Sequence, residues 1–343
     1  MKHLFLIISL ILSASATYAQ DATYHLPKTA MKLTVTYEKK SYTPGELAAY
    51  ARRFLKKNDV SLEKATSYRI LDVDVTLDAV PDTSRTYTAH IDQKHNIQKL
   101  EMSENNILLA INAEPKPIAV PKRFVPARKP AALDPYKYLN QDILAVGSKM
   151  KMAELCAQEI YDIRDSKNEL NRGQAEYMPK DGEQLRLMLE NLNTQEAAIT
   201  QMFEGVTITD TVQADIVFVP EKEVQQQVLF RFSEDYGLVD SDDYSGAPYY
   251  INIEDMHTKP ESITEPGKKA PKDETGIWIV LPGKIRATIS TAEALVKTME
   301  FSAAQFGDVE NLNEPLFTKK FLTSLILHPF NGGIDKIESL PVK

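Results

Sequence analysis

Cysteine is nearly absent from this chain of 343 residues, because Cys156 is the only one. A single cysteine cannot form an internal disulfide, so the fold has to be stabilised by packing alone. A lone cysteine within an apolar helical pattern is typical of a small buried side chain rather than a reactive thiol. We therefore expect Cys156 to belong to a core.

The chain also has no excess of positive charge, since 40 Lys and Arg residues stand against 48 Asp and Glu residues. The formal net charge of −8 offers no electrostatic footprint for nucleic acid or for anionic lipid. Long hydrophobic runs are absent too, because no segment approaches the roughly 20 apolar residues that span a bilayer. We expect no nucleic-acid partner and no membrane span.

Motifs of the common catalytic and ligand-binding sites are missing as well. The chain has no Gly-x-Ser-x-Gly nucleophile elbow, no His-Glu-x-x-His zinc motif and no Gly-rich phosphate loop. His90 and His95 are close in sequence, but a strand followed by a turn would point them to opposite faces. We therefore assign no catalytic, cofactor-binding or metal-ligating residue and expect no cofactor.

Carboxylates are the remaining route to chemistry. Asp240, Asp242 and Asp243 form an acidic loop, but a calcium-binding EF-hand would need Gly and Glu where Ser245 and Ile251 stand. We interpret this segment as a solvated acidic loop. A glycosidase pair could still lie among the 48 acidic residues, because such pairs are defined by their separation in the fold.

A second acidic set, Asp72, Asp74 and Asp78, follows the outer face of a predicted strand. Charge on such a strand discourages pairing with another sheet, and this role explains the set without any ligand. The single tryptophan, Trp278, has apolar neighbours and is expected in a core. Tyr244, Tyr249 and Tyr250 are clustered, and such a cluster is more typical of packing and edge residues than of a carbohydrate-binding platform. The 15 tyrosines of the chain could still supply such a platform.

What the chain does have is a secretory pattern at its start. A short basic beginning, Met1-Lys2-His3, precedes a nine-residue apolar run interrupted only by Ser9, and small residues follow up to Ala19. This pattern predicts a Sec-type signal peptide over residues 1–19, with cleavage after Ala19. The next residue is Gln20 rather than Cys, so we do not expect a lipoprotein. The predicted location is periplasmic or secreted.

Two Pro-rich stretches divide the rest. One holds six prolines, a spacing that excludes regular helix and central strand: Pro115, Pro117, Pro121, Pro126, Pro130 and Pro135. The other holds Pro260, Pro266 and Pro271. The predicted organisation is therefore a signal peptide (1–19), an N-terminal α+β domain (20–112), a Pro-rich linker (113–140), a helical hairpin (141–204), a β-rich segment (205–256), an exposed loop (257–275) and a C-terminal β-rich segment (276–343).

Within the first domain, alternation over residues 31–37 predicts a half-buried strand. A helix is expected next, with Thr43 as N-cap, Pro44 at its first position and Glu46 completing a capping box. Its apolar stripe is Leu47, Tyr50, Ala51, Phe54 and Leu55. In the following strand the apolar register slips between Ile70 and Val73, which indicates a β-bulge.

The hairpin is expected to pack a first helix, which carries Met152 and Ile160, against a second one that repeats Leu185 and Leu192 at seven-residue spacing. The second helix should begin at Asp181 with Gln184 as its capping partner and end at Gly205. After Gly205, apolar and polar residues alternate again, as they do in strands. The apolar run from Ile277 to Leu281 indicates a buried strand. A turn at 331–333 predicts a terminal hairpin. The expected fold class is α+β: two β-rich domains, the first with one helix packed on its sheet, joined by a helical hairpin.

Several stretches together identify a resemblance. They include the segments at 24–29 and 44–51, Ile160 to Arg164 leading to Gly173 and to Pro179 to Gly182, and the short runs at 203–205, 231–233 and 305–307. On these residues the chain resembles an uncharacterised domain-of-unknown-function family (family 4831) of exported proteins from Bacteroides-type bacteria. The resemblance implies no activity and no site residue, and neither Cys156 nor the loop at Asp240 belongs to its pattern.

Two functional hypotheses follow. The favoured one is a non-enzymatic binding or interaction protein of the cell envelope, whose partner would be an unknown envelope protein or a glycan. The alternative is a glycan or peptidoglycan hydrolase that uses an Asp/Glu pair. A pocket holding two carboxylates about 5 to 9.5 Å apart would favour the hydrolase, and an exposed apolar or tyrosine-rich patch would favour the binding protein.

Overall fold

The computed structural model describes residues 20–91, 96–118, 124–126, 132–258, 277–312 and 316–342. The predicted signal peptide lies outside these residues, as do His95 and almost all of the predicted loop at 257–275. Strands make up most of the described elements and helices are few, which agrees with an α+β class. No helix in the described part of the chain is long and apolar enough to cross a membrane.

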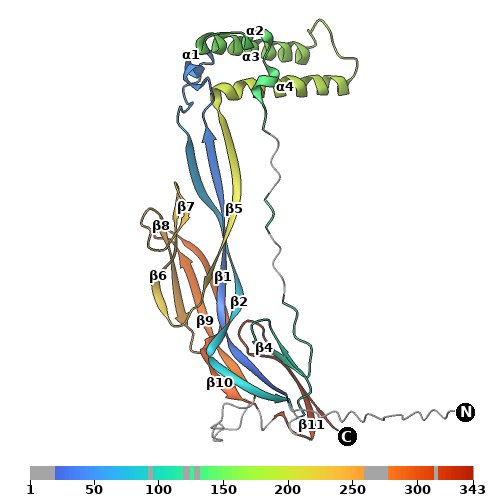
Figure 1. Cartoon of the computed structure of the whole chain (residues 1–343), viewed down its shortest axis with the longest axis vertical. Helices are drawn as coiled ribbons and strands as arrows, with labels where there is room; N and C mark the ends of the chain where they lie inside the picture. The colour runs from blue at the N-terminus through green and yellow to red at the C-terminus, as the bar shows by residue number, and fades with distance from the viewer. Residues whose placement is uncertain are drawn as a thin grey trace, which may run out of the picture.

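The molecule is elongated and is built along one three-stranded antiparallel sheet, which we call the stalk (Figure 1). Its strand order is β2-β1-β5, with β1 at Gln20–Thr43, β2 at Ala65–Ile91 and β5 at Val206–Phe218. At about 3.3 Å per residue, the 24 residues of β1 correspond to roughly 80 Å of strand. The stalk therefore sets the length of the molecule.

The helices gather at one end of the stalk and form what we call the head (Figure 1). Its elements are η1 (Ala48–Tyr50), α1 (Ala51–Phe54), η2 (Pro135–Tyr138), α2 (Gln141–Leu144), α3 (Lys149–Arg172) and α4 (Gly182–Glu204). The long helices α3 and α4 lie antiparallel. Their shared core includes Ile160, Ile199 and Phe203, and Leu47 packs into it from the segment after β1.

Two further sheets lie along the other part of the stalk. The five-stranded sheet has the order β10-β9-β8-β6-β7, with β6 at Val224–Ser233, β7 at Gly237–Val239, β8 at Ala247–Asp255, β9 at Trp278–Ser290 and β10 at Leu295–Asn311. The four-stranded sheet has the order β12-β11-β4-β3, with β3 at Leu100–Met102, β4 at Leu108–Ile111, β11 at Phe321–Leu327 and β12 at Ile334–Pro341.

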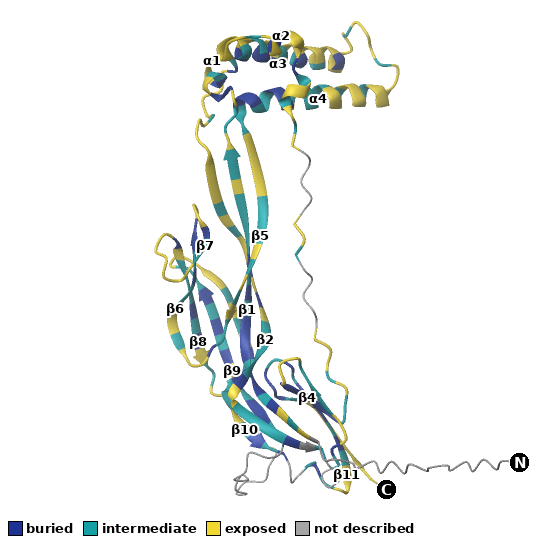
Figure 2. Ribbon diagram, viewed as in Figure 1, coloured by how far each residue is buried: buried dark blue, intermediate teal, exposed yellow. Residues whose placement is uncertain are grey.

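Alternation along β1 explains how the sheets stack. Met31, Leu33 and Val35 lie on one face of the stalk, and they pack in one core with Phe230 and Ile251 of the five-stranded sheet. Nearer the start of β1, Tyr24 and Leu26 join a separate core with strands β4, β9 and β11. Burial is concentrated in these regions, whereas the part of the stalk next to the head is largely exposed (Figure 2).

Several local predictions are confirmed. The bulge in β2 is present, because Thr36 pairs with Asp72 and Tyr37 pairs with Ile70, which leaves Leu71 as the extra residue. Helix α4 begins at the predicted cap, where the Asp181 carboxylate accepts from the Gln184 backbone N–H at 2.8 Å. The buried strand at 277–281 corresponds to the start of β9, and β11 and β12 form the predicted terminal hairpin.

Gly205 also ends α4 as predicted, with φ at +77°. The capping box itself differs in one respect, because the Gln184 side chain accepts from the Lys180 backbone N–H instead of that of Asp181. In the Pro-rich stretch, the described residues before Pro135 contain neither helix nor strand. The short helix η2 begins at Pro135, with the Asp134 side chain as its cap.

The predicted start of the first helix, with Thr43 as its N-cap, is wrong. Thr43 is the last residue of β1 and pairs with Val206, so it cannot cap a helix. Glu46 does not close a capping box, and helical structure begins only at Ala48. The predicted apolar stripe is confirmed, because Leu47, Ala51 and Leu55 are buried in the core of the head and the partly buried Tyr50 and Phe54 pack against it.

The helical hairpin does not lie between two β-rich domains. Strand β1 pairs with β5, and β4 pairs with β11, so the strands before and after the helices share two sheets. The helices instead form one end of the molecule (Figure 1). Sheet pairing between segments far apart in sequence leaves no local signal, which is why the pattern of elements suggested two domains.

The predicted helix contacts are correct only in part. Met152, Ile160 and Leu192 share the core of the head, but Leu185 is not in it. Arg164 pairs with Glu196 at 2.6 Å, and Lys167 donates to Asn193 at 2.9 Å, which sets the register of α3 against α4. In this register Leu185 and Met152 are roughly 35 Å apart along the helices.

Candidate functional site at the junction of head and stalk

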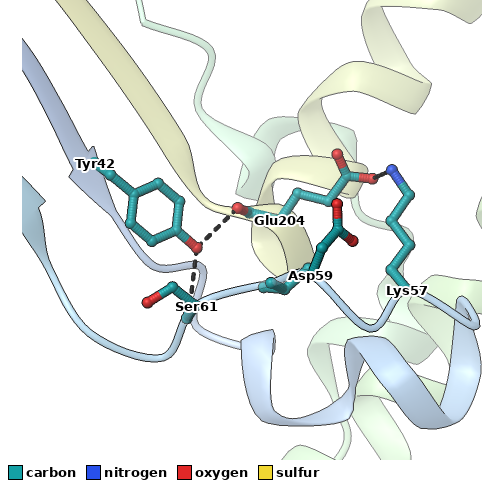
Figure 3. Close-up of a pocket in the computed structure, with 6 residues that line it drawn as sticks. Tyr42, Lys57, Asp59, Ser61 and Glu204 are labelled. Carbon is teal, nitrogen blue, oxygen red and sulfur yellow. Dashed lines mark hydrogen bonds and ion pairs between the residues drawn. The ribbon is translucent and has the colours of Figure 1, made fainter.

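A hollow of about 270 Å³ lies where the stalk enters the head (Figure 3). Three segments build it: the end of β1, the end of α4 and the loop between α1 and β2. Its lining residues are Tyr42, Lys57, Asp59, Val60, Ser61 and Glu204.

Hydrogen bonds across the hollow join the three segments. The Tyr42 hydroxyl lies 2.9 Å from the carbonyl oxygen of Ser61 and 3.0 Å from that of Glu204. A phenol has one proton to donate, so the two carbonyls share it. The Lys57 ammonium forms an ion pair with the Glu204 carboxylate. Tyr42 thus holds the loop and the helix end to the strand.

The backbone around the hollow is packed without space. A Cβ added to Gly45 would lie 2.1 Å from the Met202 carbonyl oxygen, and one added to Gly205 would lie 2.3 Å from that of Thr43. The Leu47 backbone N–H donates to the same Met202 carbonyl at 2.7 Å. The head therefore sits on the stalk through direct contact between main chains, which only glycine permits at these two positions.

Glu46 adds a polar connection beside this contact. Its carboxylate accepts from the Tyr136 hydroxyl at 2.5 Å and pairs with the Lys149 ammonium at 3.2 Å. The hydrogen bond from Tyr136, followed by that from Lys149, lowers the pKa of Glu46 below its usual value. Glu46 was predicted to cap a helix, and it instead joins η2 and α3 to the end of the stalk.

The chemistry available in this hollow is limited. No histidine or cysteine lines it, and the Ser61 hydroxyl donates to the Glu63 carbonyl at 3.2 Å. Lys57 and Glu204 compensate each other's charge, so neither is a free base or nucleophile. Among the described residues, no group of His, Cys, Asp or Glu could hold a metal ion. The arrangement fits a structural joint better than a reaction centre.

A second, larger hollow of about 900 Å³ lies on the five-stranded sheet. Its lining is mostly polar: Glu223, Val224, Gln225, Gln226, Asn252, Ile253, Glu254, Arg286 and Thr288. Arg286 is already paired, at 3.1 Å with Glu254 and at 2.8 Å with Glu300. Such a lining suits water or a hydrated ligand, unlike the largely apolar pockets that bind cofactors.

Cys156 is completely buried in the core of the head, as predicted. Burial raises the pKa of its thiol to about 11, so it is a core residue and not an activated nucleophile. The three histidines whose side chains the structure describes lie apart from one another. His25 contacts Thr86 at 2.9 Å, His257 is exposed, and desolvation lowers the pKa of His328.

Arg231 organises the acidic loop at Asp240. Its guanidinium donates to the carbonyls of Ser241 at 2.8 Å and Gly246 at 3.0 Å, and it lies 4.6 Å from the centroid of the Tyr244 ring. Asp243 accepts from the Ser245 backbone N–H at 2.9 Å. The loop is thus ordered around a side-chain cation.

The other residues singled out in the sequence have structural positions. Asp72, Asp74 and Asp78 are exposed on β2, an edge strand, although Asp74 also pairs with Lys297 at 2.6 Å. Trp278 is half-buried and stacks on Tyr87, with ring centroids 5.1 Å apart. The three tyrosines do not form one platform: Tyr249 stacks on Phe230, and Tyr244 lies over Arg231.

Sequence patterns did not single out Tyr42 or Lys57, and Glu204 and Arg231 stood only within short runs of the family resemblance, without a role of their own. Tyr42 occupies a polar position in an alternating strand, and nothing local distinguishes it from a solvated tyrosine. Gly45 carried the clearest signal, because a glycine directly after a Pro at the end of a strand indicates a close backbone approach.

The chain belongs to the family described as Domain of unknown function (DUF4831), whose model matches residues 20–335. No curated protein matches the chain, and no solved structure matches it. The family match shows the relationship without a biochemical activity.

Proposed function

We propose that this family member is an exported, non-enzymatic interaction protein of the cell envelope, and that its head is the part that contacts a partner. One observation carries the proposal: the helices lie at the far end of a stalk roughly 80 Å long, away from the other two sheets. An enzyme gains little from such a separation, whereas a protein that presents a contact surface at a distance depends on it.

The surface of the head supports a protein partner. Four large apolar side chains near the free end of α3 and α4 are exposed: Tyr177, Met178, Leu187 and Met188. The exposed fraction of Tyr177 reaches 81%. Exposed apolar side chains of this kind are typical of contact sites, and aromatic and Met residues are enriched at interfaces.

Export is part of the proposal and rests on the first nineteen residues. The basic start, the apolar run and Ala19 support cleavage before Gln20. The family match begins at Gln20, which supports a mature chain starting there. N-terminal sequencing of protein from the periplasmic fraction or culture medium should find Gln20 first; recovery of intact chain from the cytoplasm alone would contradict export.

The contact surface is tested by site-specific photo-crosslinking in cells of the source organism, with the crosslinker at Tyr177. We expect one dominant adduct in the wild-type background and its loss when Leu187 and Met188 are both changed to Glu. Leu295→Glu is the matched control, because Leu295 is 66% exposed on β10, away from the head.

The same protein should be screened for glycan and peptidoglycan hydrolysis. We expect no turnover. Turnover that is abolished by a single substitution, such as Asp59→Asn in the hollow at the junction, would overturn the non-enzymatic proposal in favour of the hydrolase.

A further inference from the structure

Strand β12 presents an open edge. It is the outermost strand of the four-stranded sheet, with β11 on one side and no strand on the other among the described residues. Residues 335–342 are all exposed, including Ile337 at 37%, Leu340 at 66% and Val342 at 53%. An edge with unpaired backbone groups and apolar side chains is a template for another strand.

Three of the other edges, those of β2, β3 and β7, are less suited to pairing. Strand β2 carries the exposed carboxylates of Asp72, Asp74 and Asp78, which repel a neighbouring strand of the same sequence. Strands β3 and β7 have only three residues each. Strand β12 has eight residues and carries both signs of charge, with Lys336 and Glu338 on one face.

We propose that β12 pairs antiparallel with β12 of a second copy of this chain, so that two four-stranded sheets become one continuous sheet across a two-fold axis. This contact lies at the opposite end of the molecule from the head (Figure 1). It is therefore independent of the contact surface proposed for the head.

Symmetry restricts the register of this pairing. Opposed residues in a sheet point to the same face, so a two-fold axis perpendicular to the sheet has to place one residue directly opposite its own copy. The central candidates for that residue are Lys336, Ile337 and Glu338. An axis at Lys336 would oppose Lys to Lys, and an axis at Glu338 would oppose Glu to Glu.

Only the axis at Ile337 makes the charges complementary. In that register Lys336 lies opposite Glu338 of the second copy, and the pair occurs twice by symmetry. Ile337 lies opposite its own copy. Asp335 is an extra residue in the pairing with β11, so Ile334 and Leu340 point to opposite faces of the sheet and do not meet. The register that makes the charges complementary also brings the two exposed Ile337 side chains together.

The charges select the register more than they hold the dimer together. Lys336 and Glu338 are exposed and already form an ion pair of 2.7 Å within the strand. Exposed ion pairs contribute little attraction. The attraction comes from backbone hydrogen bonds along the edge and from the contact between the two copies of Ile337, which gives a dimer of modest affinity.

The test is sedimentation equilibrium of the mature chain over a concentration series. We expect a reversible monomer–dimer equilibrium. The substitution Lys336→Glu places a carboxylate opposite Glu338 of the second copy, and it does so twice by symmetry. This repulsion should raise the dimer dissociation constant at least about tenfold. The double variant Lys336→Glu with Glu338→Lys exchanges the two signs, restores complementarity across the axis and should return the constant to near the wild-type value.

Lys222→Glu is the control for net charge, since Lys222 is exposed in the loop before β6, and it should leave the equilibrium unchanged. Circular dichroism verifies that each variant is folded. A wild-type chain that stays monomeric up to about 1 mM would overturn the proposal. It would also be overturned by a dimer that tolerates Lys336→Glu, or by a double variant as weak as the single one.

Discussion

Individual residues at the junction decide whether the head is held in one orientation. Tyr42 and Glu46 supply polar contacts there, while Gly45 and Gly205 allow the main chains to touch. The polar contacts are exposed or half-buried and are weak individually. The glycines are the more demanding feature, because no small adjustment of a flexible side chain can relieve a contact between backbone atoms.

Gly45→Ala should therefore destabilise the protein by about 1–3 kcal/mol, the usual cost of overpacking. The added Cβ would meet the Met202 carbonyl, which belongs to a helix and cannot move freely. Chemical denaturation followed by circular dichroism measures the change. Gly182→Ala is the matched control, since a Cβ added there would have no atom within 4 Å, and it should not destabilise the protein.

The carboxylate of Glu46 should make the stability of the junction depend on pH. Its pKa in the folded protein is lowered by Tyr136 and Lys149, below the value of about 4.3 expected in the unfolded chain. Its stabilising contribution is therefore present above the unfolded pKa and is lost as the pH falls through the folded pKa.

The variant Glu46→Gln should lower the melting temperature slightly at pH 7, by an amount corresponding to less than about 1 kcal/mol because the pair is exposed. The difference from wild type should disappear as the pH falls through the lowered pKa of Glu46, where its carboxylate becomes protonated. Thermal melts between pH 3 and pH 8 check this. A difference that persists unchanged at pH 3 would show that charge is not the cause.

At the scale of elements, the bulge in β2 keeps the apolar residues on one face. Without an extra residue, Ile70 and Val73 would point to opposite faces, because their spacing is odd. Leu71 absorbs the difference and is itself 47% exposed. Val73 and Val75 thereby stay buried against the five-stranded sheet while Ile70 packs beside them.

Deletion of Leu71 should be tolerated, because the pairs of Thr36 with Asp72 and of Tyr37 with Ile70 would remain in a regular ladder. Deletion of Thr76, which lies in the regular part of β2, would instead turn Val73 and Val75 outward. Exposure of two valines costs about 3 kcal/mol or more. Urea denaturation of both variants tests this; equal destabilisation would contradict the role given to Leu71.

Local elements were more predictable from sequence than their partners. The bulge at Leu71, the cap at Asp181, the stop at Gly205 and the final hairpin each depend on a few neighbouring residues, and each was predicted. The pairings of β1 with β5 and of β4 with β11 join segments far apart in the chain, where no local rule selects a partner. The hollow at Tyr42 escaped prediction for the same reason, since its lining comes from three such segments.

At the scale of the whole molecule, elongation is the most easily measured property. A compact protein of this length would have a radius of gyration of about 20 Å. Small-angle X-ray scattering of the mature chain, extrapolated to low concentration to avoid any dimer, should give a clearly larger value. A value close to 20 Å would mean that the head folds back onto the other sheets.

The long antiparallel ladder between β1 and β2 also bears on how the molecule responds to force. Its register runs from Gln20 with Ile91 to Tyr42 with Ala65, and its hydrogen bonds lie across the strand direction. Both strands enter the head at the same end, so a pull between the head and the opposite end would be carried by two covalent backbones in parallel and would not open the ladder. The stalk is thus a mechanically resistant tether as well as a spacer.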